Sequence, residues 1–440
     1  MTGLFNYGKA AISMYFLGKL GKDTLAGGSL AIGVANITGY SIIFGLAKGM
    51  EGITSQATGA RKWNVVGETL QCTIMVLILT CIPISLLWLI IEPILVLFRQ
   101  DPSMSYIAAT YLAFSIPDLL CQCLICPLKI FMRTQGVTLP LMYGAGLTLL
   151  IHAFTNCVVF HTYGLGIQGI ALIGAFTNLN LILVLVLYLW FSGACSQTWQ
   201  GWSWQNFNHW RSIIDQGGPS CFSVCSEWWW YEFLVLVSGG LANAADAVAS
   251  YGIIIQATSL MYNFPNALSL AVITRVGNEL GANRPDKAKT SAFTALLCSF
   301  ITAFVAMSWM MTMSDVWGQV FTQDEEVLSL LAKTLPIVGL CELGNCPQTT
   351  LCGMLTASAR PLLGAHIYFL SFYAVGLPVS LMLCFCLEFG LSGLFFGLLI
   401  AQTVCATCMI IALAQTDWED EAFNARLLLS GIGQRYGESD

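Results

Sequence analysis

The chain has 440 residues, of which 56% are hydrophobic and only 10% are charged, whereas an ordinary soluble domain carries about 25% charged residues. This composition excludes a soluble globular protein, because too few charged side chains are available to cover a surface of that size, and it indicates that lipid surrounds most of the chain. The net charge of −6 argues against a nucleic-acid partner.

Long apolar runs without strict alternation occupy most of the sequence, and they predict helices rather than the strands of a barrel. One membrane span needs about 20 apolar residues. We therefore predict an all-α integral membrane protein of about twelve transmembrane helices. The expected spans are 1–20, 28–50, 66–91, 105–131, 139–161, 166–191, 213–240, 245–272, 288–313, 327–350, 361–387 and 390–414.

The first of these stretches is weak, because Asn6 and Lys9 dilute its apolar character. It resembles the second half of a span whose beginning is missing. We therefore expect an incomplete first helix in an N-terminal six-helix bundle over 1–191. A linker rich in tryptophan follows over 192–212.

A second six-helix bundle is expected over 213–414, followed by a cytosolic tail over 415–440. Three pairs of landmarks support two repeats related by pseudo-two-fold symmetry. Gln56–Ala60 and Asn278–Ala282 close the second and eighth spans, and glycine pairs beginning at Gly166 and Gly390 open the sixth and twelfth. Pro140 and Pro361 open the fifth and eleventh. The members of these pairs lie 222, 224 and 221 residues apart.

The basic residues of the loops predict the orientation of the chain, because cytosolic loops are enriched in Lys and Arg. Ten of them follow the even-numbered spans and three lie in the opposite loops, which places both termini in the cytosol. The ten are Arg61, Lys62, Lys129, Arg133, Arg211, Arg275, Arg284, Lys287, Lys289 and Arg360, and the three are Lys19, Lys22 and Arg99.

Four acids lie inside predicted spans, where a charge is costly and indicates function by default. Glu227 and Glu232 lie in the seventh span, Asp118 in the fourth and Glu342 in the tenth. Five residues of helix turn the two acids of the seventh span about 140° apart, so we expect different roles for them. These carboxyl groups suit a proton relay or a site for a cationic solute. The alternative is that an acid only hydrogen-bonds polar groups across the bundle.

Aromatic and amide side chains near these acids are candidates for lining a cavity. Trp228 and Tyr231 follow Glu227 and are suited to stack on an organic cation or an aromatic solute. At least two of the four consecutive aromatic residues must instead pack or face lipid, because they point in different directions. The amide candidates, each of which could equally serve only to join helices, are Gln256, Asn263, Asn266 and Gln348.

Three prolines are expected to bend helices, because a proline inside a helix frees a carbonyl group of the preceding turn. They are Pro219 in the seventh span, Pro265 in the eighth and Pro347 in the tenth. His152 is a lone histidine within a span, and we interpret it as a packing residue.

No metal, cofactor or enzymatic activity is expected. Three cysteines at 121, 123 and 126 lie in the middle of a span without a histidine at ligand-like spacing, so helix packing explains them better than a metal site. The sequence has no phosphate-binding loop of the Walker type. A transmembrane gradient is therefore the expected source of energy.

Several motifs resemble those of multidrug and toxic compound extrusion (MATE) transporters, plant branch. Gln56–Ala60 resembles the string that closes the second helix of that family, and Arg275–Asn283 resembles the most specific string of its plant branch. The segment Pro347–Gly353, the Glu-Trp-Trp at Glu227 and the stretch Gln415–Trp418 after the last span are similar too. The resemblance covers about residues 10 to 420.

The resemblance implies two six-helix bundles around a central cavity and export of small organic solutes, often cationic or aromatic, in exchange for protons. It also implies coupling by the carboxyl groups of the seventh span, here Glu227 and Glu232, with Glu342 as the acid of the second bundle. Many bacterial relatives carry an aspartate in the first helix where this chain has Ser13. Relatives of this kind occupy the plasma membrane, the vacuole or Golgi and endosomal membranes.

Two alternatives remain at this stage. One is a non-transporting, shortened form of such a transporter, and the other is a flippase for lipid-linked solutes, which a strongly cationic cavity would favour. In either case the lipid bilayer surrounds the chain, which we expect to be a monomer.

Overall fold

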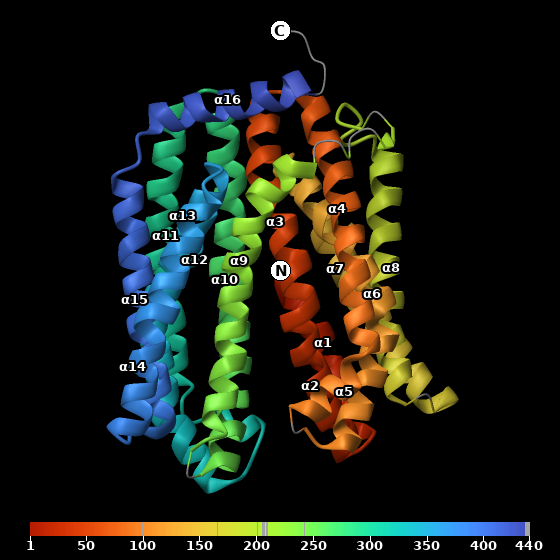
Figure 1. Ribbon diagram of the computed structural model, residues 1–440, viewed down its shortest axis with the longest axis vertical. Helices are drawn as coiled ribbons and strands as arrows, with labels where there is room; N and C mark the ends of the chain where they lie inside the picture. The colour runs from red at the N-terminus through yellow and green to blue at the C-terminus, as the bar shows by residue number, and fades with distance from the viewer. Residues whose placement is uncertain are drawn as a thin grey trace. The chain divides into compact units, whose positions relative to one another are not determined.

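The computed structural model describes residues 1–98, 100–164, 166–199, 201–204, 207, 210–241 and 243–435. Arg99, one of the three basic residues of the opposite loops, lies outside these ranges. Every described regular element is a helix, so the predicted all-α class is confirmed (Figure 1). The chain divides into two compact units, and the division falls inside a helix, between Cys221 and Phe222.

Unit 1 comprises Met1–Thr58 and Lys62–Cys221 together with the end of the chain from Gly431. Its longest helix is α6, which packs against α2, α4 and α8, while α1 packs against α7. The elements up to the start of the linker are α1 (Thr2–Lys19), α2 (Lys22–Ala35), η1 (Asn36–Tyr40), α3 (Ser41–Gly59), α4 (Trp63–Leu89), α5 (Ile91–Leu97), α6 (Pro102–Thr134), α7 (Leu139–Val158), η2 (Val159–Tyr163) and α8 (Ile167–Ser192).

Unit 2 comprises Phe222–Ser430 with the short stretch Gly59–Arg61. In its interior α12 packs against α10, α11 and α15. The elements after the linker, the first of which begins in unit 1, are α9 (Trp210–Ser238), α10 (Ala244–Gly281), α11 (Pro285–Thr312), η4 (Gly318–Val320), α12 (Glu325–Ala357), α13 (Pro361–Phe369), η5 (Leu370–Gly376), α14 (Leu377–Leu381), η6 (Met382–Cys386), α15 (Gly390–Ala414) and α16 (Trp418–Arg435).

Among the described residues, nine helical segments are long and apolar enough to cross a membrane. The helices α1, α9 and α10 fall outside that set, and each contains polar or charged residues that the sequence had singled out: Lys9 lies in α1, Glu227 and Glu232 lie in α9, and the three amides lie in α10. Counting the segments joined through η1, η2, η5 and η6 as single rods, and leaving out the seven-residue α5 and the short turn η4, the described helices up to α15 form the twelve predicted spans.

Local chemistry explains where several of these helices begin and end. Asp101 and Asp324 cap the starts of α6 and α12, because each carboxylate accepts hydrogen bonds from two backbone N–H groups of the first turn. The C-terminal ends of two other helices are also marked. Helices α3 and α10 are each followed by a residue in the left-handed conformation, Arg61 at φ 60° and Asn283 at φ 56°. These two helix ends are the ones that the repeated motifs mark in the sequence.

Candidate functional site

Glu342 lies at the centre of a polar face on α12. Its side chain is only 1% exposed. Asn345 donates to its Oε2 atom over 3.0 Å, and the thiol of Cys346 donates to the same atom over 3.4 Å. Gln348 in turn donates to Asn345 over 3.5 Å. In each hydrogen-bonded pair the two residues are three or four positions apart, so they are neighbours on the surface of the helix.

The amide oxygen of Gln348 is a second buried polar atom on this face. It accepts no hydrogen bond within the part of the chain that the structure describes. A buried acceptor without a partner is costly unless a water or a ligand satisfies it. This face of α12 therefore presents both a carboxyl group and a free acceptor to the interior of unit 2.

Glu227 on α9 joins the same part of unit 2 through tyrosine hydroxyl groups. The hydroxyl group of Tyr262, on α10, donates a hydrogen bond to its carboxylate. Tyr231 lies within electrostatic reach of both Glu227 and Glu342, and Tyr368, on α13, lies within reach of Glu227. The fold thus gathers two of the four acids around a cluster of tyrosines.

Glu232 has different surroundings from Glu227. It is half-buried, and its carboxyl group interacts electrostatically with Tyr251 of α10. The hydroxyl group of Tyr251 donates to the backbone carbonyl of Tyr231 over 2.9 Å. The two acids of α9 therefore act on different tyrosines of α10.

The consecutive tryptophans of α9 divide into three kinds of environment. Trp230 is fully buried and packs edge-on against Phe372 and Tyr373. Trp229 is 44% exposed at the surface, whereas Trp228 is half-buried. Packing and surface roles thus account for Trp229 and Trp230, and they leave Trp228 and Tyr231 as the stacking candidates.

The amide candidates of α10 differ from Gln348. Asn263 donates to the backbone carbonyl groups of Ser259 and Leu260 in its own helix, which is the structural use that a polar residue in a span commonly has. Gln256 and Asn266 are half-buried on the same helix.

All three prolines expected to bend helices lie inside continuous helices. Pro219 belongs to α9, Pro265 to α10 and Pro347 to α12. The structure shows no interruption of these helices at the prolines, and a flexing role for them stays a prediction.

Asp118 on α6 lies in a separate polar network in unit 1. Tyr40 donates to its Oδ2 atom over 2.7 Å, and Asn178 of α8 donates to its Oδ1 atom over 2.6 Å. The oxygen of the same Asn178 amide accepts a hydrogen bond from the ammonium group of Lys9 over 2.9 Å. A basic residue of α1 is thus joined to the acid of α6 through one amide.

His152 makes polar contacts beyond the packing role expected from the sequence. Its two ring nitrogens lie 3.0 Å from the hydroxyl groups of Ser13 and Thr177. A buried imidazole carries a donor and an acceptor, and both must be satisfied. Ser13 therefore belongs to a polar network that joins α1, α7 and α8.

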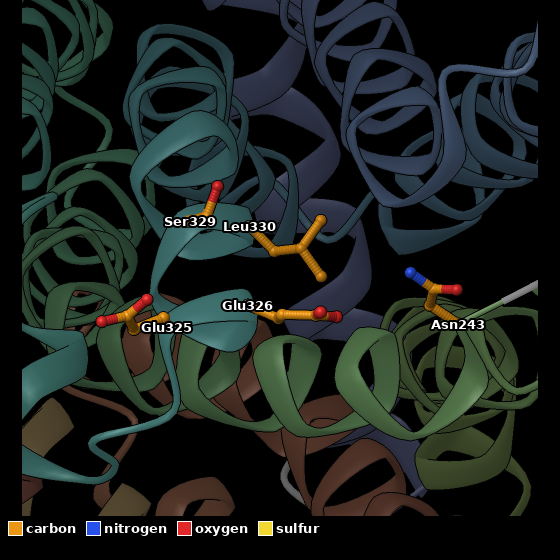
Figure 2. A pocket seen from close by; sticks show the side chains of 5 residues that line it. All are labelled: Asn243, Glu325, Glu326, Ser329 and Leu330. Carbon is orange, nitrogen blue, oxygen red and sulfur yellow. The ribbon is translucent and has the colours of Figure 1, made fainter.

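Two surface pockets in the described part of the chain lie away from these acids. One, of about 290 Å³, is lined by Asn243, Glu325, Glu326, Ser329 and Leu330. Figure 2 shows the side chains of Glu326 and Leu330 extending from α12 toward Asn243, while Glu325 points away. Another, of about 360 Å³, lies between Thr58 and the segment 193–198. None of the predicted site residues lines either pocket.

One of the strings that carry the family resemblance holds paired charges at a helix end. Glu279, within the string Arg275–Asn283, forms ion pairs with Arg275 over 3.4 Å and with Arg284 over 3.5 Å at the end of α10. In unit 1, buried Glu51 of α3 pairs with Arg133 of α6. In each of these pairs a charge has a partner of opposite sign.

Sequence reasoning missed Tyr262, Tyr40, Asn178 and Lys9. Asn178 carried the same signal as the amides that were selected, since it is an amide within a predicted span. Lys9 is interpreted from the sequence only as a residue that weakens the first span. Lys333 is exposed on α12, whereas Lys9 reaches the acid network of unit 1.

Comparison with known proteins decides the family. A profile of the MatE family matches residues 1–158 and 219–382, nearly three quarters of the chain. The chain belongs to the MatE family.

Arabidopsis thaliana supplies similar members of this family. Protein DETOXIFICATION 49 is 48% identical over 98% of this chain and 86% of its own length. Protein DETOXIFICATION 48 is 47% identical over 98% and 81%. Multidrug and toxin extrusion protein 1 of Oryctolagus cuniculus is 32% identical over 94% of this chain and 73% of its own length.

Solved structures of MATE transporters share the fold. The crystal structure of the eukaryotic MATE transporter AtDTX14 superposes with a TM-score of 0.92 at 30% identity and covers 97% of this chain and 96% of that one. A mutant of the Vibrio cholerae MATE transporter VcmN, at 18% identity, gives a TM-score of 0.84 over 95% of each chain and supports the fold alone. The predicted twelve-helix, two-bundle membrane architecture is therefore confirmed.

MatE proteins are secondary active exporters of drugs and toxins, coupled to protons or sodium ions. The predicted transporter class is thus confirmed, and the chain is a multi-pass membrane protein that handles small organic solutes.

Proposed function

We propose that this MatE protein exports small organic solutes, cationic or aromatic, in exchange for protons. The observation that supports the proposal best is the polar face of α12, where Glu342 is 1% exposed and is held by Asn345. An acid this deep in a membrane protein is costly to retain without a function.

In this proposal the carboxyl groups of Glu342 and Glu227 bind either a proton or the solute, but not both. Proton uptake removes the negative charge that holds a cationic solute and so favours its release on the far side of the membrane. Two tyrosines couple these acids. Tyr231 interacts electrostatically with both Glu227 and Glu342, and Tyr262 donates a hydrogen bond to Glu227. Glu232 is assigned to proton transfer beside Tyr251, while Asp118 belongs to the separate polar network of unit 1.

The chemistry of the neighbouring side chains favours a planar or cationic solute. Trp228 and Tyr231 present aromatic faces, which attract cations and stack on aromatic rings. The free oxygen of Gln348 supplies an acceptor, and we assign Gln256 and Asn266 to the polar lining. The names of the relatives, which refer to detoxification and to multidrug and toxin extrusion, support export over uptake.

The arrangement of the chain in the membrane is part of the proposal. The bias of basic residues supports cytosolic termini. We retain the bundles at 1–191 and 213–414, the linker at 192–212 and the tail from 415, and a monomer as the working unit.

Efflux from proteoliposomes with an imposed proton gradient tests this function. Wild-type protein is expected to move a fluorescent organic cation only when the gradient is present. Glu342→Gln and Glu227→Gln are expected to lower the gradient-driven rate at least about tenfold, because each loss of about 1.4 kcal/mol in a rate-limiting interaction costs that factor. Glu232→Gln is expected to lower it as well.

Glu388→Gln is the matched control, because Glu388 is an exposed acid in the turn between η6 and α15. It should transport at the wild-type rate. Equal efflux with and without the gradient, or full activity in both Glu342→Gln and Glu227→Gln, would contradict the proposal. No efflux from well-inserted wild-type protein would rule out active transport of these solutes.

A further inference from the structure

We propose that Lys9 is a tethered cation that permanently fills the cation position of the acid network in unit 1, so that Asp118 binds no transported proton or metal ion. This inference rests on the proposed function, since it divides the labour between the acids: coupling belongs to unit 2, and unit 1 carries its own positive charge. The observations that support it are the three hydrogen bonds that link Lys9, Asn178, Asp118 and Tyr40.

The orientation of the Asn178 amide shows the direction in which the hydrogen bonds of this network run. Its oxygen faces the ammonium group of Lys9 at 2.9 Å, and its NH₂ group faces the carboxyl group of Asp118 at 2.6 Å. The opposite orientation of the amide would place donor against donor and acceptor against acceptor. The amide dipole is therefore aligned between a cation and an anion, and this alignment transmits the attraction between them.

Asp118 is surrounded by groups that donate. Asn178 can only donate through its NH₂ group, Tyr40 donates to the other carboxylate oxygen, and Gln122 adds a further side-chain hydrogen bond. A protonated carboxyl group would lose one of these donors, because the hydroxyl oxygen of Tyr40 would have to accept its hydrogen, while a carboxylate uses all of them. The site is thus built for the anion, with the balancing charge on α1.

The other ionisable groups around this network do not replace Lys9. His152 of α7 lies between Ser13 and Thr177. Lys129, on α6 itself, interacts electrostatically with Lys9 and so adds positive charge to the region. Near Asp118 lie three neutral groups of the same helix, Tyr111, Cys121 and Cys126. Lys9 is the cation whose hydrogen bond reaches the partner of Asp118.

Unit 2 shows the contrast. The hydrogen bonds that Glu342 accepts come from Asn345 and Cys346, which are both neutral. Lys333, the basic residue of α12, is exposed. In the described part of unit 2, no ammonium or guanidinium group is hydrogen-bonded to Glu342 or to Asn345, so a mobile proton or a cationic solute can supply the positive charge there.

A double-mutant cycle on the thermal midpoint of the purified protein tests the pairing. Lys9→Met and Asp118→Asn each leave one buried charge without its counterpart, whereas the double variant removes both. We expect the double variant to melt at a higher temperature than either single variant. Lys19→Met is the control, because Lys19 is an exposed lysine of the same helix, and it should melt with the wild type.

A second measurement asks whether the position is already filled. Melting is compared in sodium chloride and in choline chloride at equal ionic strength. The wild type should show no difference. Lys9→Met should gain about 2 °C or more in sodium, because a cation that binds only the folded protein raises its midpoint. Asp118→Asn in the same background should abolish this gain.

Additive losses in the double-mutant cycle would overturn the inference, and so would a sodium response of the wild type that Asp118→Asn removes. Neither melting experiment requires transport. If the wild type is inactive in the efflux assay, that result would therefore contradict the proposed function, and the melting experiments would still test the pairing of Lys9 with Asp118. Conversely, additive melting losses would leave coupling through Glu342 and Glu227 standing.

Discussion

Buried polar residues in this protein divide into those that serve their own helix and those that reach a neighbouring functional group. Asn345 and Asn263 illustrate the difference within one unit. The amide of Asn345 donates to the carboxyl group of Glu342, whereas that of Asn263 donates to carbonyl groups of its own helix. Both had the same status in the sequence, as an amide inside a predicted span.

This difference predicts the outcome of two matched substitutions. Asn345→Ala removes a donor to a buried acid, and since a hydrogen bond to a charged group contributes about 1.5–3 kcal/mol, gradient-driven efflux should fall about tenfold or more. Asn263→Ala should change the efflux rate by less than about twofold. It removes only hydrogen bonds from the Asn263 side chain to backbone carbonyl groups, and the helix does not depend on them. Initial efflux rates at equal protein content measure both. Equal loss in the two variants would show that Asn345 has no special link to the transported charge.

At the scale of the element, close approach of helices shapes the interior of unit 2. Gly344 of α12 lies against the backbone of Gln402 in α15, where an added Cβ atom would lie 2.8 Å from the carbonyl carbon. Such a contact is shorter than any stable packing distance, so a side chain there would push α15 away from the helix that carries Glu342.

Gly344→Ala is therefore expected to destabilise the protein by about 1–3 kcal/mol, the usual cost of overpacking a core. Gly252→Ala is the control in α10, where an added Cβ atom meets nothing within 4 Å. It should be neutral or stabilising, since alanine favours a helix by about 1 kcal/mol over glycine. Thermal midpoints in detergent compare the two, and a Gly344→Ala variant that melts with the control would contradict this account of the packing.

The amphipathic helix α16 is attached to unit 2 by both apolar and ionic contacts. Trp418, Ala422, Ala425 and Leu429 form its buried face. Arg360, in the turn before α13, donates to Glu421 over 2.9 Å and to Thr416 over 2.9 Å. In Figure 1, α16 lies across the ends of the helices of this unit.

This attachment depends on pH in a direction that the burial of Glu421 determines. Burial raises the pKa of Glu421 above its ordinary value, although the neighbouring Arg360 lowers it. The docked helix therefore binds a proton more tightly than the released one, so docking strengthens as the pH falls from the raised pKa to about 4.3, the ordinary value of glutamate. It weakens as the pH rises through the same window.

Hydrogen-exchange protection factors of the α16 amides measure this effect. Protection in the wild type should increase on acidification through that window, and Glu421→Gln should remove the increase. Arg360→Ala at neutral pH leaves Glu421 buried without its cation. It should lower the free energy of local opening of α16, obtained from the protection factors, by about 1–2 kcal/mol. Protection that falls on acidification in the wild type would refute this sign.

At the scale of the whole molecule, the orientation in the membrane is the feature that loop charges predict. An inserted glycosylation acceptor reports it, because only the lumenal or extracellular side is glycosylated. An acceptor in a polar linker placed within 313–324, between α11 and α12, should be modified. The same linker within 282–284, beside Arg284 and Lys287, should stay unmodified. A reversed pattern would show that the termini are outside the cytosol.

The sequence by itself determined that this chain is helical and lies in a membrane, and that its acids, including Glu227 and Glu342, are the functional candidates. Those conclusions depend on local properties, since the length of an apolar run and the cost of a buried charge can be assessed one segment at a time. The end-of-helix motifs also identified the repeat, because a helix end is a local structure.

Only the tertiary structure decided which side chains meet. Lys9 and Asn178 are 169 residues apart and become partners because α1 and α8 face each other with a particular rotation. Tyr262 likewise reaches Glu227 from another helix. Helix rotation depends on packing against every neighbour at once, so the spacing within one span carries no information about it, and the division between a filled site in unit 1 and an open one in unit 2 could not be predicted from the sequence.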